Sequence, residues 1–224
     1  PGPLELPLDF RRPAEQTFRG DVRRRQIDAQ LQADLRRLAS DEDVTLFMVL
    51  MAAFQVLLAR YGGQRDVCIG TPIANRSRQE LELLVGFFAN TLVLRGDVSA
   101  NPTLRQLLAQ VRRTTLDAYA HQDLPFERLV EHLQPPRDVS RTPLFQVMFV
   151  LQNIPLRAQE IAGLTVAEVS FDHAPVSTFD LTLNVDEQPQ RLDLSLVFNT
   201  DLFLPATIDR LLESYEVLLR DLRA

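Results

Sequence analysis

The sequence predicts an α/β protein in which a mixed β-sheet is packed with helices. Apolar runs of strand length at residues 67–73 and 145–151 are typical of strands inside such a sheet. Residues 181–186 and 192–198 alternate apolar and polar side chains, which predicts a hairpin with one face in water. Segments with apolar residues at helical spacing lie between these strands, so helices and strands are expected to share one layered core.

The other strands are shorter or weaker. Residues 21–27 suit a short first strand, and residues 164–171 suit a weak later one. The stretch 85–95 is apolar on both sides of a single glycine and is interrupted by Asn90 and Thr91. It fits either the wall of a cleft or tunnel or a loop that enters a buried strand, and its residues alone leave both interpretations open.

Capping residues predict where the helices begin. Asp28 and Thr45 can each cap a helix, and the second of these helices is apolar on nearly all sides and therefore expected to be buried. Residues 101–102, an Asn followed by a Pro, are expected to start a third helix, and Asp123 to cap a short fourth one. A last helix with one apolar stripe is expected from about Pro205.

The start of the chain differs in composition from the rest. Residues 1–20 are rich in proline and charge, so we expect an extended strap there rather than a packed element. No initiator Met and no signal-peptide pattern is present, which suggests a piece of something longer. With 224 residues and 46% hydrophobic content, the chain can bury a core as one large domain or two small ones.

Charge and composition exclude several classes of function. The net charge of −6 argues against a nucleic-acid or membrane surface, because both need clustered cations. All 24 basic residues are arginine, so a Schiff-base lysine, a lysine general base and a phosphate-binding P-loop lysine are excluded. The most apolar segment, residues 46–59, is too short to cross a membrane.

Few residues could perform chemistry alone. Cys68 is the single cysteine, so no intrachain disulfide or zinc cluster is expected and a cytoplasmic location is the default. No Gly-x-Ser-x-Gly sequence occurs, and His121, His132 and His173 are isolated without the spacing of metal ligands. The chain therefore has stretches that suit a tunnel but no self-sufficient general base, as a binding half-site would.

Three segments in order resemble successive motifs of the condensation domains of nonribosomal peptide synthetases. They are residues 85–95 (VGFFANTLVLR), 121–127 (HQDLPFE) and 137–145 (RDVSRTPLF). Residues 70–76 (GTPIANR) and 177–183 (STFDLTL) are also similar to that family. The resemblance implies a fold of two lobes, each like chloramphenicol acetyltransferase, with the active site in a tunnel between the lobes.

The catalytic signature of the family, His-His-x-x-x-Asp-Gly, is absent from this sequence. The signature belongs to the N-terminal lobe, so the resemblance implies that this chain is the C-terminal, acceptor-side lobe of an acyltransferase that forms peptide bonds. Residues 1–20 would be the inter-lobe linker and residues 21–224 the lobe. The chain by itself is expected to be inactive and to carry no catalytic residue and no metal ligand.

The resemblance also implies roles for single residues, each beside a plainer one. Arg76 would support the active site by pairing across the lobes, or lie on the surface. Asn90 would line the substrate tunnel, or cap the turn into its strand. Phe87 and Phe88 would support the lobe.

The later motifs carry the remaining candidates. Ser177, Phe179 and Asp180 would face the tunnel, with a core Phe and an edge Asp as the alternative. Arg141 would lie at the lobe interface. Together with Arg137 and Asp138 it is expected to form an ion network that orders the loop of residues 137–141.

The expected partners are the N-terminal lobe of the same domain, peptidyl carrier proteins and an adjoining adenylation domain. No cofactor would be bound directly, because phosphopantetheine arms on the carrier proteins bring the substrates. Two alternatives remain: a non-catalytic docking or scaffold lobe of a synthetase, and a fragment of another acyltransferase of the same superfamily.

Overall fold

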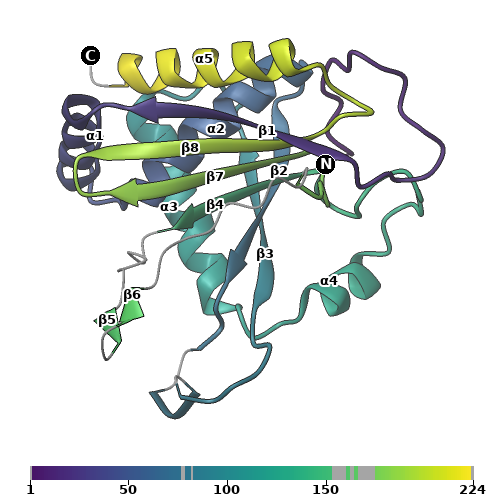
Figure 1. Cartoon of the computed structure of the whole chain (residues 1–224), viewed down its shortest axis with the longest axis horizontal. Helices are drawn as coiled ribbons and strands as arrows, with labels where there is room; N and C mark the ends of the chain where they lie inside the picture. The colour runs from purple at the N-terminus through teal and green to yellow at the C-terminus, as the bar shows by residue number, and fades with distance from the viewer. Residues whose placement is uncertain are drawn as a thin grey trace.

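The fold is built on one mixed sheet, shown in Figure 1. The computed structural model describes residues 2–76, 79–81, 83–152, 160–161, 164–165 and 175–222. β4 runs parallel to both of its neighbours, β2 and β7, and the other neighbouring strands are antiparallel. In spatial order the six strands are β1 (Gly20–Ile27), β8 (Arg191–Asn199), β7 (Leu181–Gln188), β4 (Val147–Gln152), β2 (Asp66–Ile73) and β3 (Asn90–Asp97).

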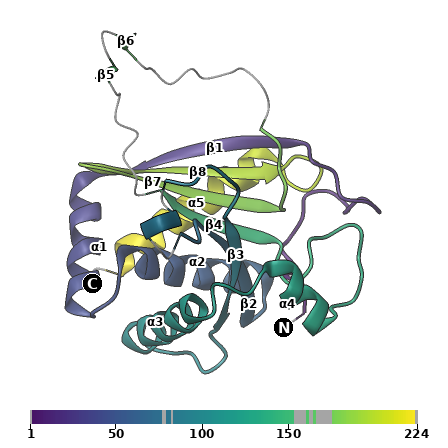
Figure 2. The same ribbon diagram turned by 90° about the horizontal axis from the view of Figure 1, so that it is seen from below.

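The main helices cover one face of this sheet, as Figure 2 shows. They are α1 (Ala29–Asp41), α2 (Leu46–Gly62), α3 (Leu104–Ala120) and α5 (Pro205–Asp221). The short helix α4 (Phe126–Leu133) lies beside β3, and η1 (Gln79–Leu81) is a single 3-10 turn. The predicted class, a mixed sheet packed with helices, is confirmed.

The core lies between the sheet and the helices. Apolar residues of each strand that point toward the helices are buried, whereas Thr182 and Asn184 of the β7–β8 hairpin are half-buried on the opposite face. This confirms a hairpin with one wetter face. Helix α2 is central to the core: Phe54 contacts Phe149 of β4 and Tyr215 of α5, with ring centroids 5.9 and 5.8 Å apart.

Two helix starts differ from those predicted. Asp28 and Thr45 cap α1 and α2 as expected. The cap of α3, however, is Thr103 in a reciprocal capping box with Gln106, so residues 101–102 lie outside the helix. Asp123 does not cap α4, because the chain enters that helix at Pro125 with no side-chain cap from its own segment.

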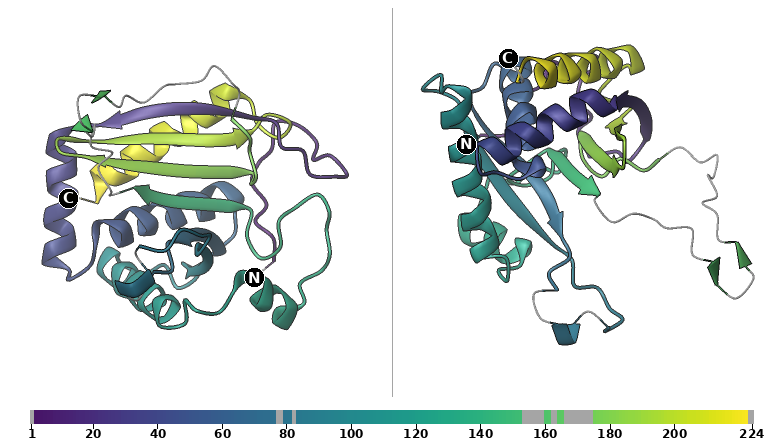
Figure 3. Two further views of the ribbon diagram at one scale, coloured as in Figure 1. Left: turned by 60° about the horizontal axis from the view of Figure 1, so that its bottom comes forward. Right: turned by 90° about the vertical axis from the view of Figure 1, so that its left-hand side faces the viewer.

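The excursion after β4 is described only in part. Its β5 (Glu160–Ile161) pairs with β6 (Leu164–Thr165) as a separate two-stranded sheet, seen away from the main body in the right view of Figure 3. Of the weak strand expected at 164–171, residues 166–171 lie outside the described residues, as does His173.

The N-terminal strap is extended as predicted, but the expectation that it does not pack is wrong. Leu4 and Leu6 are 4% and 7% exposed and belong to the core. The backbone N–H of Leu4 donates to the buried side chain of Gln146 at 2.7 Å. Apolar side chains at alternate positions of an extended segment face the same way, which lets this proline-rich strap bury both leucines.

Among the described residues no single helix is long and apolar enough to cross a membrane; α1 and α2 would satisfy such a criterion only together, as a pair bent by 103°.

Candidate functional site

The segment between the excursion and β7 contains three of the predicted site residues. Ser177 is buried, and its hydroxyl donates to the carbonyl of Phe179 at 2.6 Å. Asp180 is also buried, and its backbone N–H donates to the carbonyl of Gln146 at 3.0 Å. These local bonds hold the segment 177–180 close to the start of β4 and leave Phe179 half-buried between them.

Asp180 is not a solitary carboxylate, because Arg12 of the strap binds it through two nitrogens. Nη1 lies 2.9 Å from Oδ1 and Nη2 lies 2.5 Å from Oδ2, and Nη1 also donates to the carbonyl of Ser140 at 3.3 Å. Burial disfavours the charged guanidinium, but the hydrogen bonds and charge of Asp180 outweigh it, so the pKa of Arg12 is raised above its ordinary value.

Sequence reasoning missed Arg12. The only signal available was a pair of arginines in a proline-rich strap, and nothing local distinguishes Arg12 from its neighbour Arg11. The partner, Asp180, is 168 residues away in the chain. Such a contact becomes visible only when the strap is placed against the sheet.

Phe179 belongs to a row of three aromatic rings. Its centroid lies 5.2 Å from that of Phe145, which lies 5.5 Å from that of Phe126 at the start of α4. A Cβ atom at Gly70 of β2 would come within 2.3 Å of the Phe145 ring, so only glycine admits the ring there. The row therefore packs the segment 177–180, the residues before β4 and the start of α4 together beside Gly70 of β2.

Asn90 has its amide fully engaged by the loop that leads into α4. Its Nδ2 donates to the carbonyls of Gln122 and Leu124 at 2.9 and 2.8 Å. Its Oδ1 accepts from the backbone N–H of Phe126 at 3.1 Å and of Thr91 at 2.9 Å. Asn90 thus supplies the helix-start acceptor that Asp123 was expected to supply, and its tunnel role stays a prediction.

Arg76 contacts the stretch before β3. Its guanidinium lies 4.4 Å from the centre of the Phe88 ring, and it donates to the carbonyls of Leu81 and Gly86. Phe88 therefore supports the fold as expected, by stacking under a cation. Phe87 does not: it is 93% exposed, so the expectation that both rings support the lobe is wrong for Phe87.

The stretch 85–95 divides at Asn90. Residues before it lie outside any strand, and residues after it form the edge strand β3, with Leu92 and Leu94 buried against the helices. A small cavity of about 320 Å³ is lined by Asn90, Phe88 and Phe126 among other residues. The stretch is therefore a loop that lines a cavity and then enters a half-buried edge strand.

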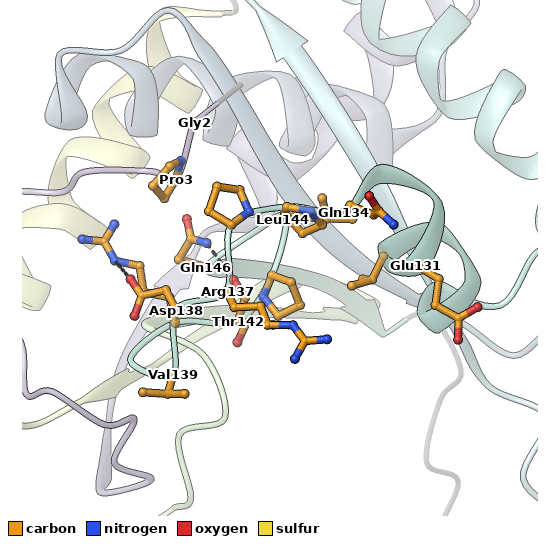
Figure 4. Close-up of a pocket in the computed structure, with 15 residues that line it drawn as sticks. Gly2, Pro3, Glu131, Gln134, Arg137, Asp138, Val139, Thr142, Leu144 and Gln146 are labelled. Atoms are coloured by element: carbon orange, nitrogen blue, oxygen red, sulfur yellow. Dashed lines mark hydrogen bonds and ion pairs between the residues drawn. The ribbon is translucent and has the colours of Figure 1, made fainter.

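Arg141 lies beside a larger cavity of about 1150 Å³, drawn in Figure 4. This cavity lies between the strap at Gly2 and Pro3, the C-terminal half of α4 and the loop that leads to β4. Arg141 pairs with Glu5 of the strap at 2.6 Å and with Asp138 at 3.5 Å.

The predicted ion network around Arg141 forms in part. Ser140 donates to Asp138 through its hydroxyl at 2.6 Å and its backbone N–H at 2.9 Å, which lowers the pKa of that carboxyl. Arg137 is exposed at the rim of the cavity. Asp138 and Arg141 thus order the loop, with Glu5 as a partner that sequence reasoning did not name.

The site therefore comprises arginines, a paired carboxylate, an amide and aromatic rings, which come from the strap, the residues after β2, the start of β3, the start of α4 and the segments before β4 and β7. Such groups can orient a bound ligand through charge, hydrogen bonds and ring contacts. Within the described ranges no three His, Cys, Asp or Glu side chains are grouped so that they could hold a metal ion.

Comparison with known proteins assigns this α/β fold to the condensation domains. A family model described as condensation domain matches residues 2–224. A linear gramicidin synthase of Brevibacillus parabrevis is 52% identical over 217 residues, which is 96% of this chain and 4% of that protein. Tyrocidine synthase 3 of the same organism is 45% identical over 99% of this chain and 3% of its own length.

Solved structures agree with the sequence relatives. A four-domain nonribosomal peptide synthetase bound to AMP and glycine superposes with a TM-score of 0.88 at 29% identity, over 98% of this chain and 18% of that one. The X-domain from teicoplanin biosynthesis gives a TM-score of 0.88 at 28% identity, over 100% of this chain and 50% of that one. The chain belongs to the condensation-domain family of nonribosomal peptide synthetases, and it spans a small fraction of the synthases that it matches.

Proposed function

We propose that this chain is the C-terminal, acceptor-side half of a condensation domain that forms peptide bonds between carrier-bound aminoacyl or peptidyl thioesters. The observation that carries the proposal is a match to the family over residues 2–224 without the His-His-x-x-x-Asp-Gly signature. Coverage of 50% of the X-domain chain supports the interpretation as one of two halves. In this proposal residues 1–20 are the inter-lobe linker and residues 21–224 the lobe.

The partners follow from the same proposal. Condensation domains act with the phosphopantetheine arms of carrier proteins, so we propose peptidyl carrier proteins, the N-terminal lobe and an adenylation domain as partners. The chain itself holds no cofactor in this scheme, and the whole protein works in the cytoplasm. Arg76 and Arg141 support the lobe interface, and Asn90, Ser177, Phe179 and Asp180 line the tunnel or hold its wall.

The inactivity of the lobe alone is directly testable. Residues 1–224 and the full-length protein are each mixed with donor and acceptor carrier proteins loaded with aminoacyl thioesters, and the peptidyl thioester is measured by mass spectrometry. Full-length protein is expected to form product and the isolated chain none, because residues 1–224 lack the His-His-x-x-x-Asp-Gly signature. Product from residues 1–224 alone would contradict the half-domain proposal.

A docking role is the second candidate, and one observation favours it. The X-domain from teicoplanin biosynthesis has also been solved in complex with OxyB, and that chain superposes on this one with a TM-score of 0.84 at 28% identity. A full-length protein that binds loaded carrier proteins but forms no peptidyl thioester would support docking. Product formation by the full-length protein would support condensation.

A further inference from the structure

The strap is hydrogen-bonded to the segment 177–180 at Ser177, Thr178 and Asp180. The backbone N–H of Ser177 donates to the carbonyl of Phe18 at 3.1 Å, and Gln16 Nε2 donates to the carbonyl of Thr178 at 2.5 Å. One residue before the segment, Val176 forms a β-bridge with Arg19. The strap thus runs beside the segment that carries most of the predicted tunnel residues.

The strongest of these contacts is between two charged side chains that are both largely buried. The side chains of Arg12 and Asp180 are 13% and 7% exposed. A two-pronged arginine–carboxylate pair fixes both the distance and the plane of the carboxylate, which a single hydrogen bond does not. Without Arg12 the carboxylate would be left buried and unpaired, and it would turn toward water.

A rotation of the Asp180 side chain would also displace its neighbours. Asp180 directly follows Phe179, whose ring stacks on Phe145, and Phe145 in turn contacts Phe126 of α4. Arg12 also donates to the carbonyl of Ser140, so it ties the loop before β4 to the same point. The position of the strap is therefore coupled to the aromatic row.

We propose that Arg12 is a positioning residue: by clamping Asp180 it sets the conformation of the segment 177–180 and the placement of Phe179. The inference rests on the proposed function, because it assigns this clamp to the acyl-transfer site. Since the strap would be the connection to the other lobe, movement of that connection would reach the tunnel wall through the clamp. Arg12 itself does not touch the reacting atoms in this scheme.

The test uses the full-length protein and three variants, Arg12→Gln, Asp180→Asn and the double variant. Each single variant is expected to lower kcat about 10- to 100-fold with KM for the acceptor carrier protein changed less than about threefold. The double variant is expected to recover part of the loss, because it leaves no unpaired buried charge. If the two single variants lower kcat by equal factors, and the double variant lowers kcat by the product of these factors, the two side chains act independently and the clamp is refuted.

A second readout separates the clamp from activity. Hydrogen exchange of peptides that cover residues 176–181 is expected to be faster in Arg12→Gln by at least about tenfold. The matched control, Arg25→Gln, breaks an ion pair between β1 and Glu216 of α5 and should speed exchange there while leaving 176–181 and kcat unchanged. Unchanged exchange at 176–181 in a folded Arg12→Gln protein would refute the proposal.

The two proposals can fail separately. If the full-length protein formed no peptide bond, the proposed function would fail, and the exchange measurement would still show whether Arg12 holds the segment. If product formed and Arg12→Gln changed neither kcat nor exchange, the proposed function would stand and the positioning role would fall.

Discussion

Asn90 shows how one amide can organise a connection between two elements. Its four side-chain hydrogen bonds link the start of β3 to the loop before α4 and to the first residue of that helix, and each one satisfies a backbone group. The first free N–H of α4, at Phe126, is among them. This amide is thus held mainly by backbone groups distant in sequence.

Replacing this amide should loosen the loop. Asn90→Ala is expected to lower the free energy of unfolding by about 1–3 kcal/mol, because several half-buried hydrogen bonds are lost together. Denaturant unfolding measures the change, and hydrogen exchange should rise in residues 122–126. Thr103→Ala is the matched control, since it removes the cap of α3, costs about 1 kcal/mol and should leave 122–126 protected. An unchanged stability in Asn90→Ala would show that the loop is held by packing.

At the scale of elements, α5 is joined to β1 and to the start of α1 by ion pairs. Glu216 pairs with Arg25 and with Arg220, and Arg220 also reaches Asp28, the cap of α1, at 2.9 Å. Burial opposes ionisation of Glu216, but the two arginines outweigh it and lower its pKa. The pKa of Asp28 is lowered first by the backbone N–H of Leu31 and then by Arg220.

These lowered pKa values predict acid sensitivity. A carboxyl with a lowered folded-state pKa stabilises the fold above its unfolded pKa, about 4 for Asp and Glu, and the gain is lost as pH falls through the folded value. The free energy of unfolding should therefore fall more between pH 6 and pH 3 in the wild type than in Glu216→Gln. Denaturant unfolding of both proteins at several pH values across this range measures the free energy of unfolding. Parallel curves for the two proteins would show that Glu216 does not carry the effect.

On the scale of the whole molecule, apolar side chains are not all covered by the layers of the fold. Helices cover one face of the sheet, and the stretch before β3 carries large apolar side chains in water. Leu83, Val85 and Phe87 are 93%, 104% and 93% exposed. Apolar side chains gathered in this way usually meet a partner surface. In the proposed two-lobed domain the other lobe would be that partner.

The isolated chain should therefore self-associate. Light scattering of residues 1–224 over a dilution series is expected to show a mass that rises with concentration, because copies cover each other's apolar side chains. Val85→Ser with Phe87→Ser should reduce this rise without changing the free energy of unfolding, since both side chains are exposed. A strict monomer at every concentration would contradict the expectation.

The sequence by itself was sufficient for the elements whose signals are local. Alternation predicted the β7–β8 hairpin, helical spacing predicted α2 and α5, and Asp28 and Thr45 were identified as caps because a cap contacts only the next three residues. Motif order also led to the family. The sequence could not locate the start of α3 or the cap of α4, because several candidate capping residues lie close together at each of these positions.

The tertiary structure alone decided how the predicted site residues are held. Asp180 is clamped by Arg12 of the strap, Phe179 stacks in a row with two rings from other elements, and Asn90 serves the start of α4. Each of these contacts joins residues far apart in the chain, and a pattern along the sequence does not reveal such pairs. The partner of a side chain depends on where the fold brings the rest of the chain, and in this protein the fold brings the strap against the segments that precede β4 and β7.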